Sequence, residues 1–472
     1  MTELADIRSL AVVGLGASGA AAAVLARRRL GVPVTAIDDK GAEALTGLDE
    51  LRQAGVELRL GSRAGLPKRF DVLVKSPGVP TQNAAVQVAL ARGVPVWSEV
   101  ELACRFLANR IVGITGTNGK TTTTELTGAL VRDAGMPVAV AGNVGHARAR
   151  VPDEVVPDTI VVAELSSFQL EHIERFRADV AVLLNLTEDH VDRHGSYEAY
   201  AAAKLRIFET QDEACLALLN GEDEGVSTVK VAGRGRRGYF ATGAAPAALL
   251  AGVERGVLWL DLDALGAGGG RVSLCDAREL SLKGTHNLSN SLAAAAAAAA
   301  VGVPSASIAR TLCTFPGVRH RLQVVGVVAG VTYVNDSKAT NVDAALKALT
   351  AYSGPVHLIL GGSLKGASFD PLARATEGVV REVILIGAAA PVLEDAYARR
   401  ARESGSRAAP YVVLPDLPAA VRHAARVARP GDVVLLSPAC ASYDQYRNYE
   451  QRGEHFIELV EALLGDEVHS GI

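Results

Sequence analysis

Cysteine is scarce and unpatterned in this sequence. Its five cysteines among 472 residues are scattered along the chain, and none belongs to a C-x-x-C pair. This spacing predicts neither a zinc site nor a disulfide framework, and it is typical of a protein of the reducing cytosol. We therefore expect a cytoplasmic protein.

Charge of one sign and long apolar runs are also scarce. The formal net charge of −4 leaves no basic surplus, so we expect no nucleic-acid partner. The first residues lack the basic-then-apolar pattern of a signal peptide, and the alanine run 293–300 has side chains too small for a membrane anchor. We expect no membrane insertion, and a monomer.

The most informative stretch is a glycine-rich loop between an apolar strand and a helix. Residues 113–124 read Gly-Ile-Thr-Gly-Thr-Asn-Gly-Lys-Thr-Thr-Thr-Thr, and the glycines let the backbone approach phosphate oxygens. In such a loop Lys120 neutralises the phosphates and the hydroxyl of Thr121 reaches a Mg²⁺. Gly113 lies one position further from Gly119 than the usual pattern has it. The stretch predicts a nucleoside triphosphate site of variant form.

A second glycine pattern lies near the start of the chain. Gly14, Gly16 and Gly19 satisfy G-x-G-x-x-G. Asp38 ends the next strand about 20 residues on, where a dinucleotide fold places its ribose-binding acid. Taken alone, the pattern favours a dehydrogenase, whereas the neighbouring triphosphate loop favours another diphosphate such as a nucleotide sugar. These residues leave both hypotheses open.

Length and patterning predict an α/β protein with three domains. The chain exceeds what one core usually sustains, and short Val/Ile/Leu runs alternate with Ala/Leu/Arg-rich helical stretches. We expect a Rossmann-like domain over 1–98, a central P-loop ATPase domain over 99–317 and a Rossmann-like domain over 318–472. The Gly- and Arg-rich segment 233–271 is expected to form weak strands and loops that decorate the central domain.

Polar side chains follow predicted strands of the central domain. Glu164 closes one strand and His190 follows the next, and open α/β sheets bind ligands at such strand ends. Glu164 is a candidate Mg²⁺ ligand, since hard cations prefer oxygen. An ordinary loop residue remains the alternative for His190, a turn former for Asn143, and a solvated surface charge for Lys204 on its predicted helix.

The third predicted domain carries donors at separate strand ends. Asp336 supplies an acceptor, and Lys338 and Thr340 supply donors between a strand and a helix. A helix N-cap is the alternative for this stretch. Lys365 and Ser442 follow two further strands. Together with Thr340, they predict a site for a dianionic small molecule.

Eight motifs of the second and third predicted domains resemble those of one family, the Mur ligases, and the resemblance covers all three predicted domains. They are Gly-Thr-Asn-Gly-Lys-Thr-Thr (116–122), Glu-Leu-Ser-Ser-Phe-Gln-Leu-Glu (164–171), Asn-Leu-Thr-Glu-Asp-His (185–190), His-Asn (286–287), His-Arg (320–321), Asn-Asp-Ser-Lys-Ala-Thr-Asn (335–341), Ser-Pro-Ala-Cys-Ala-Ser-Tyr-Asp-Gln (437–445) and Glu-Gln-Arg-Gly (450–453). The last two are similar to the D-glutamate-adding branch. The resemblance implies a ligase of peptidoglycan precursor synthesis. Such an enzyme adds D-glutamate to UDP-N-acetylmuramoyl-L-alanine through an acyl phosphate, using ATP and two Mg²⁺ ions.

The resemblance also implies roles for individual residues. Lys204 would carry a CO₂-derived carbamate, and the catalytic residues would be Lys120, His190 and Lys204. The metal ligands would be Thr121, Glu164, His190 and the Lys204 carbamate. Those implied for ATP are Gly116, Thr117, Asn118, Gly119, Lys120, Thr121, Thr122, Asn287, Arg321 and Asp336. Those implied for the UDP-substrate are Ala17, Ser18, Asp38, Asp39, Ser76, Gly78, Asn143, Ser166 and His190. Those implied for D-glutamate are Lys338, Thr340, Lys365, Ser442 and Tyr449.

Other functions remain as alternatives. A sibling Mur ligase or a folylpolyglutamate synthase would share the central motifs, but a folate enzyme should lack the glycine-rich start. A nucleotide-sugar dehydrogenase would use that start for NAD, and Glu164, His190 and Lys204 argue against it. Since ATP is expected on the central domain and the amino acid on the third, those domains are expected to close for reaction.

Overall fold

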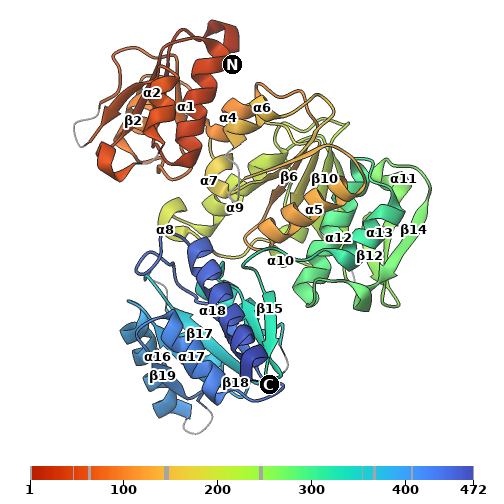
Figure 1. The fold of residues 1–472 in the computed structure, drawn as a ribbon. Coiled ribbons are helices and arrows are strands. Elements are labelled where there is room, and N and C mark those ends of the chain that lie inside the picture. Colours follow the sequence, from red (N-terminus) through yellow and green to blue (C-terminus); the bar gives the residue numbers. More distant parts are fainter. Residues whose placement is uncertain are drawn as a thin grey trace. The chain divides into compact units, whose positions relative to one another are not determined.

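The structure is a computed structural model that describes residues 3–45, 47–61, 65–142, 148–243, 248–352, 354–364, 368–404 and 408–470. The chain forms two compact units, Met1–Phe315 and Pro316–Ile472. The described strands form three sheets, two in the first unit and one in the second (Figure 1). This confirms the predicted three-domain α/β fold, while the boundaries at 98 and 317 stay predictions. Within the described part, no helix is long and apolar enough to cross a membrane.

The first sheet is wholly parallel, in the order β3-β2-β1-β4-β5. Its strands are β1 (Leu10–Val13), β2 (Val34–Asp38), β3 (Glu57–Leu60), β4 (Val72–Lys75) and β5 (Val96–Ser98). The helices that connect them are α1 (Ala17–Leu30), α2 (Leu48–Gln53) and α3 (Ala84–Ala91). This Rossmann-like order puts a topological switch point between β1 and β4, where open α/β sheets bind ligands beyond the carboxyl ends of the strands.

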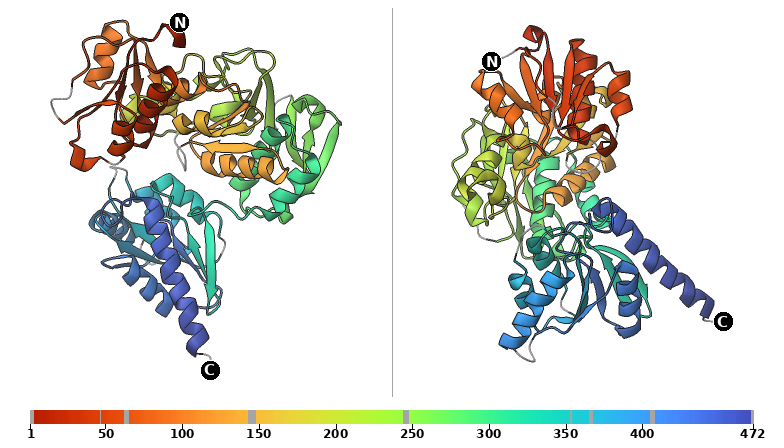
Figure 2. Two further views of the ribbon diagram at one scale, coloured as in Figure 1. Left: turned by 45° about the horizontal axis from the view of Figure 1, so that its top comes forward. Right: turned by 90° about the vertical axis from the view of Figure 1, so that its left-hand side faces the viewer.

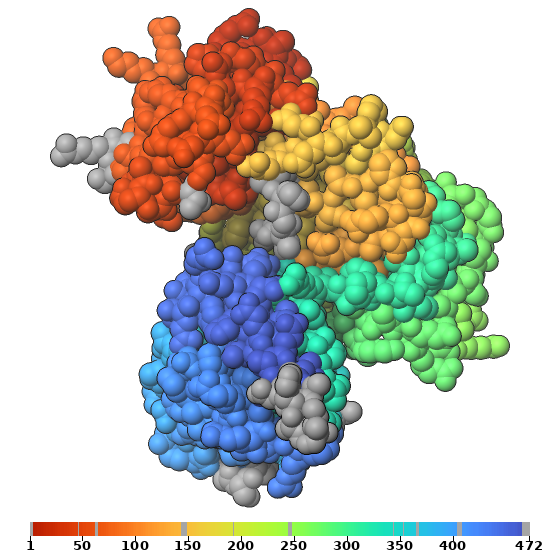
Figure 3. All heavy atoms as spheres, in the orientation of Figure 1, coloured from red at the N-terminus to blue at the C-terminus, as the bar shows by residue number. Residues whose placement is uncertain are grey.

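The second sheet has the order β14-β13-β12-β11-β10-β9-β6-β8-β7. Its strands are β6 (Ile111–Thr115), β7 (Val138–Ala141), β8 (Ile160–Glu164), β9 (Val180–Leu183), β10 (Leu216–Asn220), β11 (Arg236–Ala241), β12 (Leu249–Glu254), β13 (Val257–Asp261) and β14 (Arg271–Asp276). The strands predicted within 233–271 are confirmed, but they continue the main sheet through backbone pairing instead of decorating the domain. Figure 3 shows the described part of this segment in green at the surface of the molecule.

The described helices around the second sheet range from 4 to 16 residues in length. They are α4 (Glu99–Cys104), α5 (Lys120–Asp133), α6 (Val151–Glu154), α7 (Ser167–Leu170), α8 (Val191–His194), α9 (Tyr197–Leu205), α10 (Glu224–Ser227), α11 (Leu262–Leu265), α12 (Thr285–Ala300) and α13 (Ser305–Thr314). The alanines at 293–299 are wholly buried, and α12 packs against α5 (Figure 1). Small side chains permit this close approach, so the alanine run belongs to the core.

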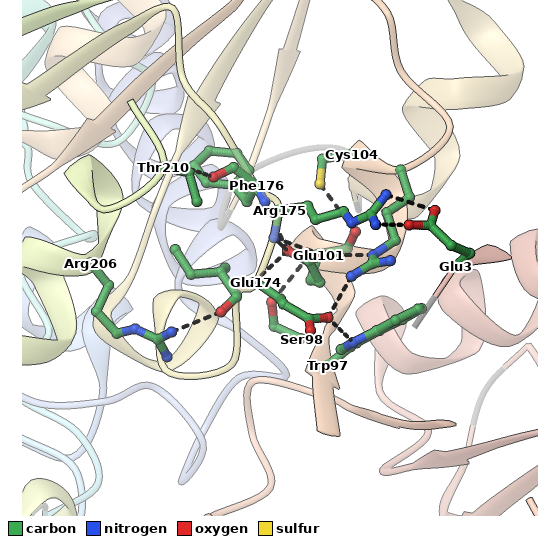
Figure 4. A network of polar contacts seen from close by, with 12 residues as sticks. Glu3, Trp97, Ser98, Glu101, Cys104, Glu174, Arg175, Phe176, Arg206 and Thr210 are labelled. Carbon is green, nitrogen blue, oxygen red and sulfur yellow. Dashed lines mark hydrogen bonds and ion pairs between the residues drawn. The ribbon is translucent and has the colours of Figure 1, made fainter. Parts of the chain in front are cut away.

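A buried carboxylate joins the end of the first sheet to the second. Glu101 on α4 accepts the backbone N–H groups of 174–176 at 2.8 to 3.0 Å and Nε of Arg105 at 2.7 Å (Figure 4). Glu174 in turn accepts from Arg105 and from the indole N–H of Trp97 on β5. Because Glu101 is fully buried, these donors offset the cost of removing its charge from water. The segment that follows α7 is thereby fixed to the first sheet.

The second unit contains one sheet, in the order β15-β16-β20-β17-β18-β19. Its strands are β15 (Gln323–Val328), β16 (Val331–Asn335), β17 (Val356–Gly361), β18 (Val380–Ile386), β19 (Tyr411–Val413) and β20 (Val433–Leu436). Its helices are α14 (Val342–Leu349), α15 (Asp370–Ala375), α16 (Ala390–Ser404), α17 (Leu417–Val427) and α18 (Tyr449–Ser470). Only β15 runs antiparallel to its neighbour among these described strands. The long helix α18 packs on β15 and is seen from two sides in Figure 2.

Candidate nucleotide and substrate site

The glycine-rich loop connects β6 to α5, as predicted. Gly116 has φ 153° and Gly119 has φ 82°, values that favour glycine. A Cβ on Gly119 would lie 2.4 Å from Oδ1 of Asn290, so this backbone approaches its neighbour too closely for a side chain. Gly113 instead lies inside β6 and packs near Leu165. The expectation that Gly113 lines the phosphate loop was therefore wrong.

The loop is held open at the N-terminus of α5. The N–H groups of Thr117 and Asn118 donate to the carbonyl and the side-chain oxygen of Asn185, at 3.0 and 2.8 Å. Thr121 is half-buried and Thr122 buried on the first helical turn. The first N–H groups of a helix have no partner within it and favour anions, so this glycine-lined turn fits a phosphate group.

Two lysines meet at the loop. Nζ of Lys120 donates to the carbonyls of Gly116 and Thr117 at 3.0 and 2.8 Å, and Nζ of Lys204 donates to the same Gly116 oxygen at 2.7 Å. Lys204 is only 2% exposed, so the alternative of a solvated surface lysine is wrong. Burial lowers the pKa of Lys204 well below its usual value; the Lys120 charge adds to this shift, and Asp189 and Glu164 oppose it.

His190 stands at the start of α8 with a left-handed backbone, φ 52°. Its Nε2 lies 3.7 Å from Oδ2 of Asp189, and its ring centroid lies 6.5 Å from that of Tyr200. The Tyr200 ring also lies 4.8 Å from Nζ of Lys204, and its hydroxyl donates to Oγ1 of Thr117 at 3.0 Å. Tyr200 was missed from the sequence, although it lies one helical turn before Lys204 on the same face of α9.

The cation ligands expected from the sequence come from separate elements. Glu164 is buried at the end of β8, and Thr121 lies on the first turn of α5. Within the described ranges, no three His, Cys, Asp or Glu side chains are grouped as a metal site. The oxygen donors Thr121 and Glu164 suit a hard ion that takes its remaining ligands from phosphate and water. Lys204 fits such an ion only as a carbamate, because an ammonium would repel it.

The N-terminal part of α12 also reaches the loop. Asn287 donates through Nδ2 to the Lys283 carbonyl at 2.8 Å, and its Oδ1 accepts from Asn290 at 3.4 Å. Asn290 is buried against Gly119. Sequence reasoning selected Asn287 and missed Asn290. The spacing of three residues, which puts both on one helix face, was the available signal.

The switch point of the first sheet brings two predicted segments together. Asp38 ends β2 and accepts the N–H of Leu15 at 2.6 Å, so its carboxylate shapes the glycine turn that precedes α1. Ser76 is buried beside Gly14, and a Cβ on Gly78 would meet no atom within 4 Å. Ala17, Ser18 and Asp39 lie near the same edge, on the first turn of α1 and directly after β2.

Ser166 is the N-cap of α7 in a capping box, and its hydroxyl donates to Oε1 of Gln169 at 3.0 Å. Asn143 and Lys365 lie outside the described residues.

In the second unit, Asp336 is buried where β16 ends. Its carboxylate accepts the Ser437 hydroxyl at 2.8 Å and the Leu322 N–H at 3.2 Å. Burial raises the pKa of Asp336 to about 6, and the charge of Arg321 acts in the opposite direction. The N-cap of α14 is Asn341, so the helix-cap alternative for Asp336 is wrong.

One buried arginine organises the loops that carry the predicted amino-acid-binding residues. Arg452 donates to the Ser337 carbonyl at 2.8 Å and to the carbonyls of Gly361, Cys440 and Ala441 at 3.2 to 3.3 Å. Lys338 and Thr340 follow Ser337, and Ser442 follows Ala441. The ring of Tyr449 lies 5.5 Å from Nζ of Lys338. Arg452 lies in one of the motifs, but its role was missed because two of its acceptors, the carbonyls of Ser337 and Gly361, are distant in sequence.

Three family models match consecutive parts of the chain. They describe a Mur ligase MurD-like N-terminal domain at 8–98, a Mur ligase middle domain at 114–298 and a Mur ligase glutamate ligase domain at 320–440. The UDP-N-acetylmuramoylalanine–D-glutamate ligase of Pelotomaculum thermopropionicum is 43% identical over 460 residues, covering 97% of this chain and 98% of that one. The chain belongs to the Mur ligase family. The enzyme of the same name from Anaeromyxobacter dehalogenans is 45% identical over 460 residues. The match covers 95% of this Mur ligase and 96% of that relative.

Solved structures of other Mur ligases share the fold. UDP-N-acetylmuramate–alanine ligase MurC from Thermotoga maritima has a TM-score of 0.59 at 19% identity, and the match covers 96% of this chain and 99% of that one. MurF ligase from Thermotoga maritima, solved in complex with ADP, has a TM-score of 0.59 at 18% identity, with 92% and 96% covered. At such identity the likeness concerns the fold alone.

Proposed function

We propose that this Mur ligase joins D-glutamate to UDP-N-acetylmuramoyl-L-alanine at the expense of ATP, in peptidoglycan precursor synthesis. The substrates are those named for relatives that match along the whole chain. The structural observation that carries the proposal is the burial of Lys204 at 2.7 Å from the Gly116 carbonyl of the phosphate loop. We also propose that the protein is cytoplasmic and monomeric and that it has no nucleic-acid partner.

The first half-reaction activates a carboxylate. The carboxylate of UDP-N-acetylmuramoyl-L-alanine takes the γ-phosphoryl group of ATP, which yields an acyl phosphate and ADP. Lys120 would leave the loop carbonyls and place its charge on the phosphates, where negative charge shifts during transfer. Bound Mg²⁺ would supply further positive charge, held by Thr121 and Glu164 for one ion and by His190 and carbamylated Lys204 for a second.

The second half-reaction forms the amide bond. The amine of D-glutamate attacks the acyl carbon and phosphate leaves. Lys338, Thr340 and Ser442 would supply donors to the D-glutamate carboxylates, with Tyr449 beside Lys338. Arg452 would hold the loops that carry these donors, since it bonds to the segments directly before them.

The UDP portion would bind at the switch point of the first sheet. The glycine turn at Gly14–Ser18 would present backbone to the diphosphate, and Ser76, which lies beside Gly14, and Gly78 would lie on the uridine side. Asp38 already supports that turn through the Leu15 N–H. We therefore propose that Asp38 shapes the site and also contacts the nucleotide.

An assay of phosphate release tests this function. The protein is incubated with ATP, Mg²⁺ and UDP-N-acetylmuramoyl-L-alanine, and a panel of D- and L-amino acids is added singly. We expect release only with D-glutamate, and none when the UDP-substrate is omitted. Turnover with another amino acid, or turnover independent of the UDP-substrate, would contradict the proposal.

A further inference from the structure

One arginine of the second-sheet domain holds the loop that follows β4 of the first sheet. Nη2 of Arg193 donates to the carbonyls of Pro77 and Val79 at 2.7 and 2.8 Å, and Nη1 donates to that of Gly78 at 3.3 Å. These residues follow Ser76, on the proposed uridine side of the substrate. Arg193 lies on α8, three positions after His190. A planar guanidinium can serve several carbonyls at once, which a lysine cannot do in the same geometry.

An aromatic ring completes the connection. Cζ of Arg193 lies 4.1 Å from the centroid of the Phe168 ring. The same ring meets the His190 ring edge-on at 4.9 Å and stacks with His194 at 5.3 Å. Phe168 lies on the first turn of α7, two positions after the N-cap residue Ser166. Arg193 and Phe168 together therefore contact the uridine-side loop and the turn that carries His190.

A buried ion pair reinforces the same connection. Nζ of Lys75, at the end of β4, donates to the Val79 carbonyl at 2.8 Å and to Glu171 at 3.1 Å. The other Glu171 oxygen lies 3.5 Å from Nδ1 of His194, whose Nε2 contacts Oγ of Ser167 at 2.9 Å. Lys75 is fully buried, so this pair is shielded from solvent.

We propose that Arg193 is a positioning residue that transmits the placement of the uridine-side loop to His190. The inference rests on the proposed function. Binding of the UDP portion against Ser76 and Gly78 fixes the three loop carbonyls to which Arg193 donates. Because Arg193 lies on α8, these hydrogen bonds also fix the start of α8, where His190 lies. Binding energy from a remote part of the substrate is thereby used at the reacting carboxylate. Arg193 does this without contacting the reacting atoms.

The test compares Arg193→Ala, Arg193→Lys and a control, Arg278→Ala. Arg278 is exposed, and among its described contacts its side chain bonds only to Asp276. Phosphate release gives kcat and KM for each substrate, and calorimetry with UDP gives the affinity of the nucleotide portion alone. We expect kcat of Arg193→Ala to fall about 100-fold, as misplacement of reacting groups by about 1 Å does. UDP affinity and KM for ATP should stay within about threefold of wild type, and Arg193→Lys should recover part of kcat.

Three results would overturn the inference. They are a kcat of Arg193→Ala equal to wild type, a loss of UDP affinity as large as the loss of kcat, and a lysine variant no better than alanine. If the alanine variant does not fold, Arg193→Lys decides the matter, since a folded lysine variant with wild-type kcat contradicts a positioning role. Failure of wild type and Arg278→Ala to release phosphate would contradict the proposed function instead.

Discussion

Lys204 and Lys120 share one acceptor, the carbonyl oxygen of Gly116, at 2.7 and 3.0 Å. Two ammonium groups this close, one of them buried, repel each other strongly in a medium of low dielectric constant. Burial, which disfavours the charged form, is the main cause of the lowered pKa of Lys204, and the neighbouring Lys120 charge lowers it further. A neutral amine is also the form that adds CO₂. The geometry thus supports the proposed carbamate at this lysine.

Removal of the Lys204 side chain should nearly abolish turnover. We expect Lys204→Ala to lose at least about 100-fold in kcat, because a carboxylate-like ligand for Mg²⁺ is lost. Added acetate or formate should restore part of the activity by occupying the vacated space. Phosphate release with increasing acetate is the measurement. Lys230→Ala, at an exposed lysine, should be active and insensitive to acetate. An active Lys204→Ala variant would refute the role.

UDP, and not NAD, should protect the protein against thermal unfolding. A ligand that binds only the native state stabilises it, by about 2.7 kcal/mol when its concentration is 100 times Kd. We propose that the glycine turn beside Ser76 binds the diphosphate of UDP. Differential scanning fluorimetry with each nucleotide measures the shift. Protection by NAD in the absence of UDP would support the dehydrogenase alternative.

The stability of the second unit should depend on Asp336 below neutral pH. Burial raises the pKa of Asp336 from 3.8 to about 6, so the folded unit holds the proton more tightly than the unfolded chain. Its contribution to stability is therefore greatest at low pH and is lost as pH rises from about 4 to about 6. Asp336→Asn should become more stable relative to wild type over that range, by up to about 3 kcal/mol.

Urea unfolding of both proteins at pH 4 and pH 7 measures this difference. A matched variant, Asp370→Asn, removes an exposed carboxylate whose pKa is lowered by hydrogen bonding to Arg399. It should show no relative gain with rising pH. If the stability difference between Asp336→Asn and wild type is the same at pH 4 and pH 7, the raised pKa of Asp336 is contradicted.

Local patterns predicted the features that depend on neighbouring residues. The phosphate loop before α5 and the glycine turn before α1 were placed correctly, since glycine, strand and helix signals lie within a few residues. Gly113 was misassigned because one extra residue leaves it inside β6. Strands were predicted correctly within 233–271, but their place in the main sheet was missed because short strands gain their pairing from the existing sheet.

Features that depend on distant contacts were beyond prediction from the residues alone. Helical periodicity placed Lys204 at a surface, and only the packing of α9 on the loop buries it. Arg193 donates to the Pro77 carbonyl and Arg452 donates to the Gly361 carbonyl, and each acceptor is over 90 positions away in sequence. Main-chain acceptors carry no residue type, so no pattern marks them.

The route of one oxygen atom tests the central claim most directly. UDP-N-acetylmuramoyl-L-alanine labelled with ¹⁸O in its alanine carboxylate is turned over with ATP and D-glutamate, and the released phosphate is analysed by mass spectrometry. If the carboxylate takes the phosphoryl group and phosphate then leaves the acyl carbon, each phosphate carries one ¹⁸O atom from the substrate. Phosphate free of ¹⁸O, released while the amide product forms, would contradict the account.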